Sequence, residues 1–362
     1  MTATATRPGA RPAAGGRPRD GRLPGARPAR GTGGHAAGLA AAGLVLACVV
    51  AASLALGTRG MSPGTVVEAL VAPRPGDADH MVVRELRLPR TLIGLAAGAA
   101  LGLAGTLIQA ATRNPIADPG LLGLNAGACL GVVAAITWLG VASPVGYIWF
   151  AFAGTLVAGL VVHGVTAMGR GPSAPTRLTL AGVAVTAALT SITTTILLGD
   201  VETLDRYRFW VVGSLVGRDA GALASLLPFL LTGAALALAL GRGLDALALG
   251  DDVARGLGHR VGRTRALTAA AVVLLCGSAA ALAGPLAFVG LVAPHAARRL
   301  AGADHRWVLR YALVLGPALV LAADVAGRFL APPGEMEAGL VIAVVGAPVM
   351  IAVVRSPAMR RA

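Results

Sequence analysis

The sequence predicts an all-α, polytopic membrane protein with about ten transmembrane helices. Of its 362 residues, 56% are hydrophobic and only 13% are charged, whereas soluble domains average about 25% charged residues. The mean hydropathy is +0.74, and 50 glycines accompany long uncharged runs, as is common in membrane helices. These observations exclude an ordinary soluble protein, so each long apolar run is a candidate span.

The chain begins with a segment that is too polar to fold. Residues 1–37 are rich in Arg, Pro, Gly and Ala, and such a composition predicts a disordered basic tail. The run that follows, 38–58, is free of charge over about the ~20 residues that a spanning helix needs. Because the tail is too long for a typical signal peptide, we expect an uncleaved first span.

Seven further charge-free windows follow the first span. Two of them are too long for one helix. The window 120–169 must cross twice with a turn at residues 142–144, and the window 266–297 divides at Gly284-Pro285, because proline favours a turn or a first helical position. The remaining windows are 91–112, 178–199, 221–241, 311–323 and 338–354, and the fourth of these extends as a span to about residue 326 with Asp324 near its end. Together they predict a ten-span domain over residues 38–355.

The basic residues predict the orientation of these spans. All 31 basic residues are Arg, and 22 of them fall on the side of the N-terminus. Since cytoplasmic loops are enriched in basic residues, we expect both termini in the cytoplasm of a bacterium, with the chain in its plasma (inner) membrane. The Arg residues flank apolar runs rather than forming a wet basic surface, which argues against a nucleic-acid partner despite the net charge of +14.

The composition also excludes several kinds of chemistry. Without Lys the chain lacks the usual phosphate-binding loop, so we expect that it is no enzyme and does not hydrolyse ATP itself. Its three cysteines are too scattered for a zinc pattern or a disulfide framework. No metal site and no cofactor is therefore expected in this chain.

Three Arg residues at the predicted outer surface form the first candidate site. Arg87 and Arg90 precede the second span, and Arg328 ends the ninth. They are either interfacial anchors or a dock for a carboxylate-bearing partner. Cations at a helix N-terminus oppose the helix macrodipole, which favours the docking interpretation.

A second candidate site lies at the inner end of the second span. Gln109 stands in an apolar helix, and Asn114 and Pro115 begin a proline-punctuated connection to the third span. Irregular backbone at a membrane edge is tolerated where protein or a water-filled cavity surrounds it. We therefore predict that these three residues line a translocation path, with helix–helix bonding by Gln109 as the alternative.

The loop 249–265 is a third candidate site. Two acidic residues precede a stretch that predicts a short helix with Ala and Leu on one face and a glycine stop. A pure connector needs no apolar face, so this helix is predicted to bind a partner, although its Arg residues also fit ordinary cytoplasmic charge. The predicted contact residues are Asp252, Ala254, Arg255, Leu257 and Gly258.

A series of short motifs runs in order from about residue 60 to 355. They are Arg87-Leu88-Pro89-Arg90, Gly98-Ala99, Gly105, Gln109, Asn114-Pro115-Ile116-Ala117-Asp118-Pro119, Leu122-Gly123, Trp210-Val211-Val212-Gly213-Ser214-Leu215, Leu249-Gly250, Ala254-Arg255, Leu257-Gly258, Gly284-Pro285-Leu286 continuing to Pro294-His295, Asp304-His305-Arg306, Ala323-Asp324, Arg328 and Gly346-Ala347-Pro348. In order and spacing this set resembles the permeases of ABC importers for iron-siderophores, haem and cobalamin.

This resemblance implies a fold like that of the cobalamin importer permease and a function in the uptake of an iron-siderophore-type metal chelate. It implies a second permease in a homo- or heterodimer, two cytoplasmic ABC ATPase subunits and an extracytoplasmic binding protein. Arg87, Arg90 and Arg328 would pair with Glu residues on the two lobes of the binding protein, and loop 249–265 would seat in an ATPase. Glu337 stands where the family has Pro.

Two other functions remain open from the residues alone. An ion- or proton-coupled secondary transporter would place ionisable residues in the middle of its spans, and the predicted spans have none there. A membrane anchor without transport would explain the hydrophobicity but not the polar cluster at Gln109 and Asn114.

Overall fold

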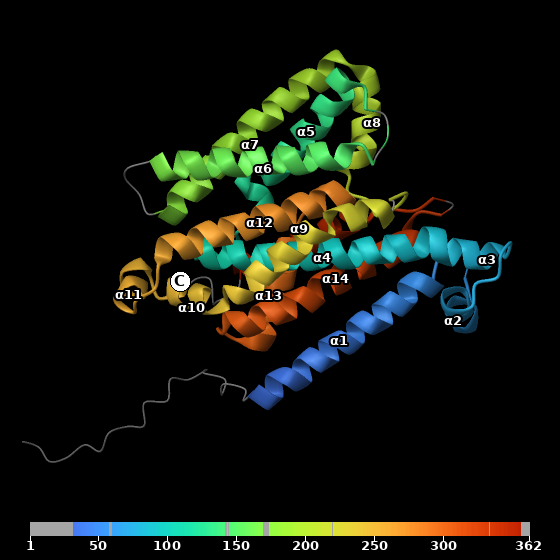
Figure 1. Ribbon diagram of the computed structural model, residues 1–362, viewed down its shortest axis with the longest axis horizontal. Helices are drawn as coiled ribbons and strands as arrows, with labels where there is room; N and C mark the ends of the chain where they lie inside the picture. Colours follow the sequence, from blue (N-terminus) through green and yellow to red (C-terminus); the bar gives the residue numbers. More distant parts are fainter. Residues whose placement is uncertain are drawn as a thin grey trace, which may run out of the picture.

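The computed structural model describes residues 32–57, 60–141, 143, 145–168, 174–218, 220–332 and 334–355, and every regular element in them is a helix (Figure 1). Residues 32–37, expected in the tail, are helical and begin α1, whereas the rest of the predicted tail lies outside the described residues, as do two of the three residues at the turn 142–144. The ten helices that correspond to the predicted spans are α1 (Thr32–Ala55), α4 (Leu88–Thr112), α5 (Leu124–Leu139), α6 (Tyr147–Met168), α7 (Ala174–Gly199), α9 (Ala220–Ala239), α12 (Val261–Ala283), α13 (Val289–Ala301), α14 (His305–Leu330) and α15 (Ala338–Arg355).

Short helices join these ten. They are α2 (Pro63–Val71), α3 (Ala78–Met81), the π-helical turn η1 (Val82–Arg87), the 3-10 turn η2 (Pro119–Leu122), α8 (Val201–Val211), α10 (Gly241–Ala248) and α11 (Asp251–Gly256). Asp77, Asp200 and Asp304 cap α3, α8 and α14, since each carboxylate accepts backbone N–H groups of the first turn. The π turn stands directly before Pro89, which lacks an N–H, and Leu88 N–H bonds five residues back to Val83 O.

Seven helical stretches are long and apolar enough to cross a membrane. Two more, in α5 and α15, are apolar but shorter than 18 residues. The tenth, α13, has only 13 residues and ends in Arg298 and Arg299. It starts late because the chain turns at Gly284 and Phe288, both of which have positive φ. The ten predicted spans therefore exist as helices, but the eighth covers only part of the membrane thickness.

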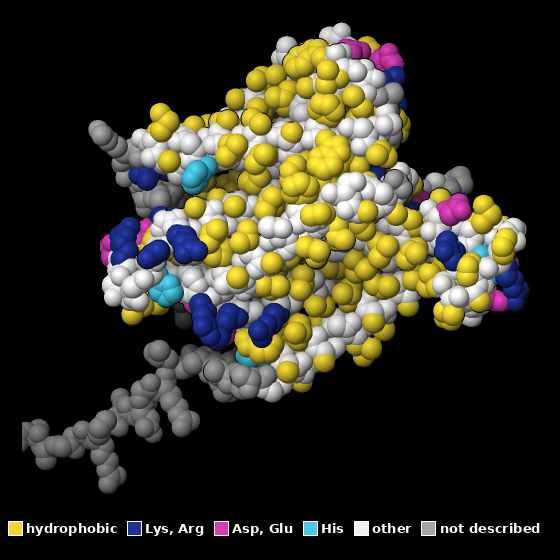
Figure 2. All heavy atoms as spheres, viewed as in Figure 1, with side chains coloured by type: hydrophobic (Ala, Val, Ile, Leu, Met, Phe, Trp, Pro, Cys, Tyr) yellow, Lys and Arg dark blue, Asp and Glu magenta, His cyan; other side chains and the backbone are white. Residues whose placement is uncertain are grey.

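The bundle has two charged ends and an apolar belt between them (Figure 2). We call the end with α10 and α11 the α11 end and the end with α2 and α3 the α2 end; both are visible in Figure 1. Helix α1 starts at the α11 end, and the long helices then alternate in direction. The exposed apolar side chains include Leu44, Leu160, Leu231 and Ile351, each from a different helix. A belt of this kind fits a lipid bilayer.

Helix α4 forms the centre of the bundle, and 78% of its apolar window is buried, against 17% for α1 and for α7. Three of its glycines allow two other helices to approach its backbone. A Cβ on Gly98 or Gly102 would lie 2.6 or 2.5 Å from backbone atoms of α14, and a Cβ on Gly105 would lie 1.9 Å from Gly290 O of α13. Close backbone approach through small residues is typical of membrane helix packing.

Candidate docking ends and the segment between them

At the α2 end, two Arg side chains cap the C-terminus of α1. Arg87 Nη1 donates to Leu54 O and Ala55 O at 2.7 and 2.8 Å. Arg328 Nη1 donates to the carbonyls on either side of this pair, those of Ser53 and Leu56, at 2.7 and 2.5 Å. A helix C-terminus leaves carbonyl groups without intrahelical partners and carries partial negative charge. Four successive carbonyls of α1 are thus bound by two guanidinium groups.

A third Arg completes this network. Arg90 Nε donates to both carboxylate oxygens of Asp324 at 2.9 and 3.0 Å, and its Nη1 donates to Glu335 Oε2 at 2.7 Å. Asp324 also accepts from Arg328 Nη2 at 2.7 Å. Asp324 is almost fully buried, whereas the Glu335 side chain is 29% exposed. The buried carboxylate is therefore paired twice, and the exposed carboxylate lies at the surface over Arg90.

These contacts correct one part of the sequence interpretation. Arg87 and Arg328, expected as outward cations, are 7% and 4% exposed and bind the end of α1. The reason is long-range, because α1 and α14 together surround these side chains. Arg90 is the most accessible of the three, with 12% of its side chain exposed. The docking role of the three Arg residues stays a prediction, and Arg90 is the position from which a partner carboxylate is most easily reached.

In the last turn of α4, Gln109 connects this helix to α13. Its Nε2 donates to Gly290 O at 3.1 Å, and its Oε1 accepts from Arg298 Nη2. Gln109 is nearly completely buried, so in this conformation it binds α13 rather than facing an open path. Such a bond satisfies the amide inside the bundle. The predicted role in a translocation path remains untested for Gln109.

The backbone between α4 and α5 is irregular and held by its own polar side chains. Arg113 ends α4 with φ +52°, and Asn114 Oδ1 accepts from Ile116 N at 3.1 Å. Asp118 Oδ1 accepts from Gly120 N at 2.8 Å and so caps η2. Burial raises the pKa of Asp118 to about 6. Asn114 and Pro115 are partly exposed, in a connection whose shape is set by side chain–backbone bonds.

Two motifs distant in sequence meet where α12 breaks. Ser214 N donates to Ala283 O at 2.8 Å, and Gly339 N donates to Gly213 O at 3.0 Å. A Cβ on Gly284 would lie 2.4 Å from Trp210 O, and Gly213 and Gly284 have positive φ. The Trp210–Leu215 and Gly284-Pro285 motifs therefore join the ends of α8 and α12 to the start of α15. The positive φ angles and the close backbone approach explain why residues 213 and 284 are glycine.

One polar helix face was missed in the sequence. The C-terminal half of α7 exposes Thr190, Ser191 and Thr194. Within the described part of the chain, these three hydroxyls have no hydrogen-bond partner, whereas the buried Thr193 bonds back to Leu189 O at 2.8 Å. An unbonded hydroxyl in hydrocarbon costs about 2–7 kcal/mol. This face therefore suits contact with water or a protein partner better than contact with lipid. In the sequence, the run of hydroxyl residues along 190–195 is the signal that could have predicted it.

At the α11 end, Asp251 holds α11 in place. Its Oδ1 accepts from Arg265 Nη2 of α12 at 2.9 Å and lies 3.8 Å from Arg113 Nη2 at the end of α4. Asp252, the predicted contact residue, is almost fully exposed and pairs only with Arg255, at 2.7 Å. Asp252 but not Asp251 is predicted from the sequence as a contact residue, because their different surroundings depend on where α4 ends and where α12 begins.

The short helix of this loop forms as predicted, but with a different apolar face. Ala254 is fully buried, whereas Leu257 is 63% exposed, so the two do not share an outward face. The exposed apolar side chains at this end are Leu249, Val253 and Leu257, spaced four residues apart. Gly258 follows with φ +82°, consistent with the predicted glycine stop. Of the predicted contact residues, Ala254 therefore packs inside and Leu257 lies at the surface, and contact with an ATPase stays a prediction.

The chain is similar to known transport proteins over most of its length. The sequence profile of the FecCD transport family matches residues 44–356. The ferric enterobactin transport system permease protein FepD of Escherichia coli (strain K12) is 47% identical over 320 residues, which cover 88% of this chain and 95% of that protein. The siderophore transport system permease protein YfiZ of Bacillus subtilis (strain 168), whose assignment is described as probable, is 37% identical over 86% of this chain and 93% of its own length.

A solved structure supports the same relationship. It is described as an inward-facing conformation of a metal-chelate type ABC transporter. It aligns with a TM-score of 0.78 at 25% sequence identity and covers 88% of this chain and 99% of that chain. Because nearly the whole of that chain is matched, the likeness extends over the entire helical bundle rather than over one motif.

Proposed function

Because the chain belongs to the FecCD transport family, we propose that it is the permease subunit of an ATP-driven importer for an iron-siderophore-type metal chelate. The observation that carries this proposal is the 47% identity to a ferric enterobactin permease over 88% of the chain. The helical bundle with an apolar belt and two charged ends supports it. A ferric catecholate is accordingly the first substrate to test.

The two ends then take different roles. The α11 end faces the cytoplasm, where the exposed side chains of Leu249, Val253 and Leu257 and the ion pair of Asp252 with Arg255 bind an ABC ATPase. The α2 end faces outward and binds the substrate-loaded binding protein, with Arg90 as the central cation. This orientation follows from the excess of Arg at the α11 end.

The path itself requires a second permease subunit. The hydroxyl face of α7 at Thr190, Ser191 and Thr194 is exposed in the single chain. A polar chelate needs hydrogen-bonding groups where the two subunits meet, and this face would supply them. We therefore assign the hydroxyl face of α7 to the lining of the path. The partly exposed Asn114 and Pro115 extend this path toward the α11 end.

Reconstitution tests the proposal. The chain is assembled in liposomes with the ATPase and binding protein encoded beside its gene, with ATP enclosed, and uptake of ⁵⁵Fe-labelled ferric catecholate is measured. ATP-dependent accumulation that requires the binding protein is the expected result. Accumulation driven by a proton gradient in the absence of ATP would instead identify a secondary transporter, and no accumulation of catecholate, hydroxamate or citrate complexes would refute a siderophore importer.

A further inference from the structure

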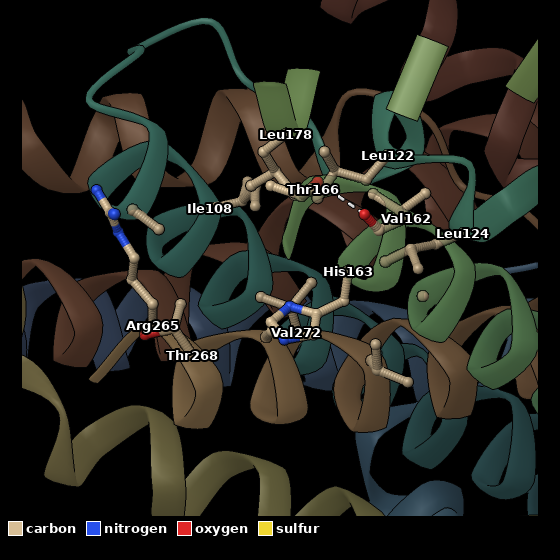
Figure 3. A pocket seen from close by; sticks show the side chains of 14 residues that line it. Ile108, Leu122, Leu124, Val162, His163, Thr166, Leu178, Arg265, Thr268 and Val272 are labelled. Atoms are coloured by element: carbon tan, nitrogen blue, oxygen red, sulfur yellow. Dashed lines mark hydrogen bonds between the residues drawn. The ribbon is translucent and has the colours of Figure 1, made fainter. Parts of the chain in front are cut away.

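An apolar cavity of about 120 Å³ lies toward the α11 end, where α6 and the start of α7 face α12 (Figure 3). Its deep wall consists of side chains that are nearly fully buried, among them Leu124, Val162 and Val272. Polar groups collect at the other side, where Figure 3 shows Arg265 and Thr268 at one edge of the cavity. The cavity is therefore amphiphilic, apolar in depth and polar toward the α11 end.

Thr268 is unusual among the buried threonines. Thr106, Thr112 and Thr155 each donate a hydrogen bond to the carbonyl four residues earlier, at 2.7 to 2.9 Å. Thr268 lines the cavity and is 2% exposed, but its Oγ1 has no partner among the described residues. A buried hydroxyl without a partner is costly. The cavity thus contains a hydrogen-bonding group for which the described part of the chain supplies no acceptor or donor.

The lining residues of α12 are ordered along the helix axis. Arg265 comes first, Thr268 follows one turn deeper, and Val272 one further turn deeper. At 1.5 Å per residue, these seven positions span about 10 Å. Arg265 stands directly before the apolar run that begins at residue 266, which places its guanidinium at the level of lipid headgroups. Asp251 accepts a bond from its Nη2, and an Arg has five N–H donors in all.

We propose that this cavity binds one anionic phospholipid from the leaflet at the α11 end. The phosphate is held by Arg265, an ester oxygen accepts a hydrogen bond from Thr268, and an acyl chain fills the space against Leu124, Val162 and Val272. His163 of α6 lines the same cavity, between its polar edge and its apolar wall. Its side chain is exposed at the surface of the single chain. A soluble phosphate would satisfy Arg265 but leave the apolar depth empty.

The site has a structural consequence. The cavity is lined by α6 and the start of α7 on one side and by α4 and α12 on the other, so an acyl chain there contacts helices of both groups. Bound lipid is therefore expected to stabilise the seating of α6 and α7 against the central helices. The leaflet assignment rests on the proposed orientation, whereas the binding site itself does not depend on transport.

Lipid titration of the purified full-length chain in dodecyl maltoside tests this proposal. Dioleoyl-phosphatidylglycerol should raise the thermal unfolding midpoint of the chain. It should also stay bound to the chain in native mass spectrometry, as one lipid per protein. Dioleoyl-phosphatidylcholine and inorganic phosphate serve as the zwitterionic and the soluble arms, and both should act weakly. Because neither readout involves uptake, loss of transport in the reconstituted importer and loss of lipid binding are separate results.

Three variants and one control sharpen the test. Arg265→Gln should require about tenfold more phosphatidylglycerol for half of the shift, since one charge-assisted contact is lost. Thr268→Val should raise the midpoint without lipid but reduce the lipid response, and Ala269→Leu should fill the cavity and abolish retention. Arg263→Gln, on the same helix but exposed and outside the cavity, should behave as wild type. Equal responses to both lipids, or an undiminished response in Ala269→Leu, would overturn the proposal.

Discussion

Arg90 and Asp324 are 234 positions apart in the sequence, yet Arg90 Nε donates to both carboxylate oxygens of Asp324, at 2.9 and 3.0 Å. The contact joins the start of α4 to the C-terminal part of α14. Asp324 also binds Arg328, which in turn holds the end of α1. One buried carboxylate therefore connects three helices at the α2 end.

Removal of this charge should be severely destabilising. Asp324→Asn leaves Arg90 and Arg328 close together without their shared counter-charge, and breaking a buried ion pair costs about 3–5 kcal/mol. The thermal unfolding midpoint of the purified chain should fall by many degrees. Glu335→Gln removes the partly exposed partner of Arg90 and should cost no more than about 1 kcal/mol. Equal midpoints for the two variants would refute the assigned role of Asp324.

The docking prediction centres on Arg90. Arg90→Glu should weaken association with the binding protein beyond the ~0.2–1 kcal/mol of an exposed pair, and a Glu→Arg change on the partner should recover part of the loss. Glu335→Gln should tighten association, because Glu335 competes for Arg90 Nη1. Surface plasmon resonance over a salt series measures both, since steered association weakens with ionic strength.

Arg84→Glu is the matched control for this series, because Arg84 is exposed at the same end. It should change binding little. If Arg90→Glu binds as wild type at low salt, Arg90 is a structural anchor of α4 and the docking interpretation fails.

Gly258→Glu should uncouple the ATPase. Gly258 has φ +82° and open space around its Cβ position, so a side chain there strains the backbone by about 1–2 kcal/mol and adds a charge beside Leu257. We expect a normal membrane level but loss of the copurified ATPase. Gly256→Glu places the same side chain in equally open space without positive φ, and should retain more of the ATPase. A Gly258→Glu protein that still transports would contradict the assignment of this loop.

The orientation can be checked by cysteine labelling. In a background without Cys48, Cys129 and Cys276, a cysteine at Ala78 of the α2 end should react with an impermeant maleimide in intact cells. A cysteine at Gly256 of the α11 end should react only after the cells are permeabilised. The reverse pattern would invert the proposed topology and with it both docking assignments.

Asp118 predicts a pH dependence of stability. Its ordinary pKa of 3.8 is raised to about 6 by burial, so the folded chain retains a proton that the unfolded chain releases between about pH 4 and pH 6. Stability from this group falls as pH rises through that window and is then constant.

Asp118→Asn should remove this dependence, while its amide oxygen still accepts from Gly120 N. Above pH 6 the variant should be more stable than wild type, by at most about 3 kcal/mol for a shift of about two units. Unfolding midpoints at pH 4.5 and pH 7.5 measure the difference. If the unfolding midpoints of variant and wild type differ by the same amount at pH 4.5 and at pH 7.5, Asp118 does not titrate in this way.

The sequence by itself determined which segments are apolar and long enough to enter a lipid bilayer. Apolar runs long enough for a bilayer, and prolines that divide two of them, predict the ten longer helices among those that the structure describes, because the length and hydrophobicity of a span are local properties. The short helix of loop 249–265 was also predicted, since its acidic start and glycine stop are local signals. Local composition did not predict that α13 would have 13 residues, because its start depends on how Gly284 and Phe288 pack.

Only the tertiary structure decided what the polar residues contact. Arg87 and Arg328 are predicted as outward cations from their neighbours in sequence, but α1 ends beside them and supplies four carbonyl groups. Asp251 rather than Asp252 anchors α11, because Arg113 at the end of α4 and Arg265 near the start of α12 both lie beside Asp251. The unpartnered hydroxyl of Thr268 is evident only once α6 and α12 enclose a cavity. The partners named here for Arg87, Arg328 and Asp251 are more than ten residues away. The free energy of a buried polar group depends on such partners rather than on its own segment.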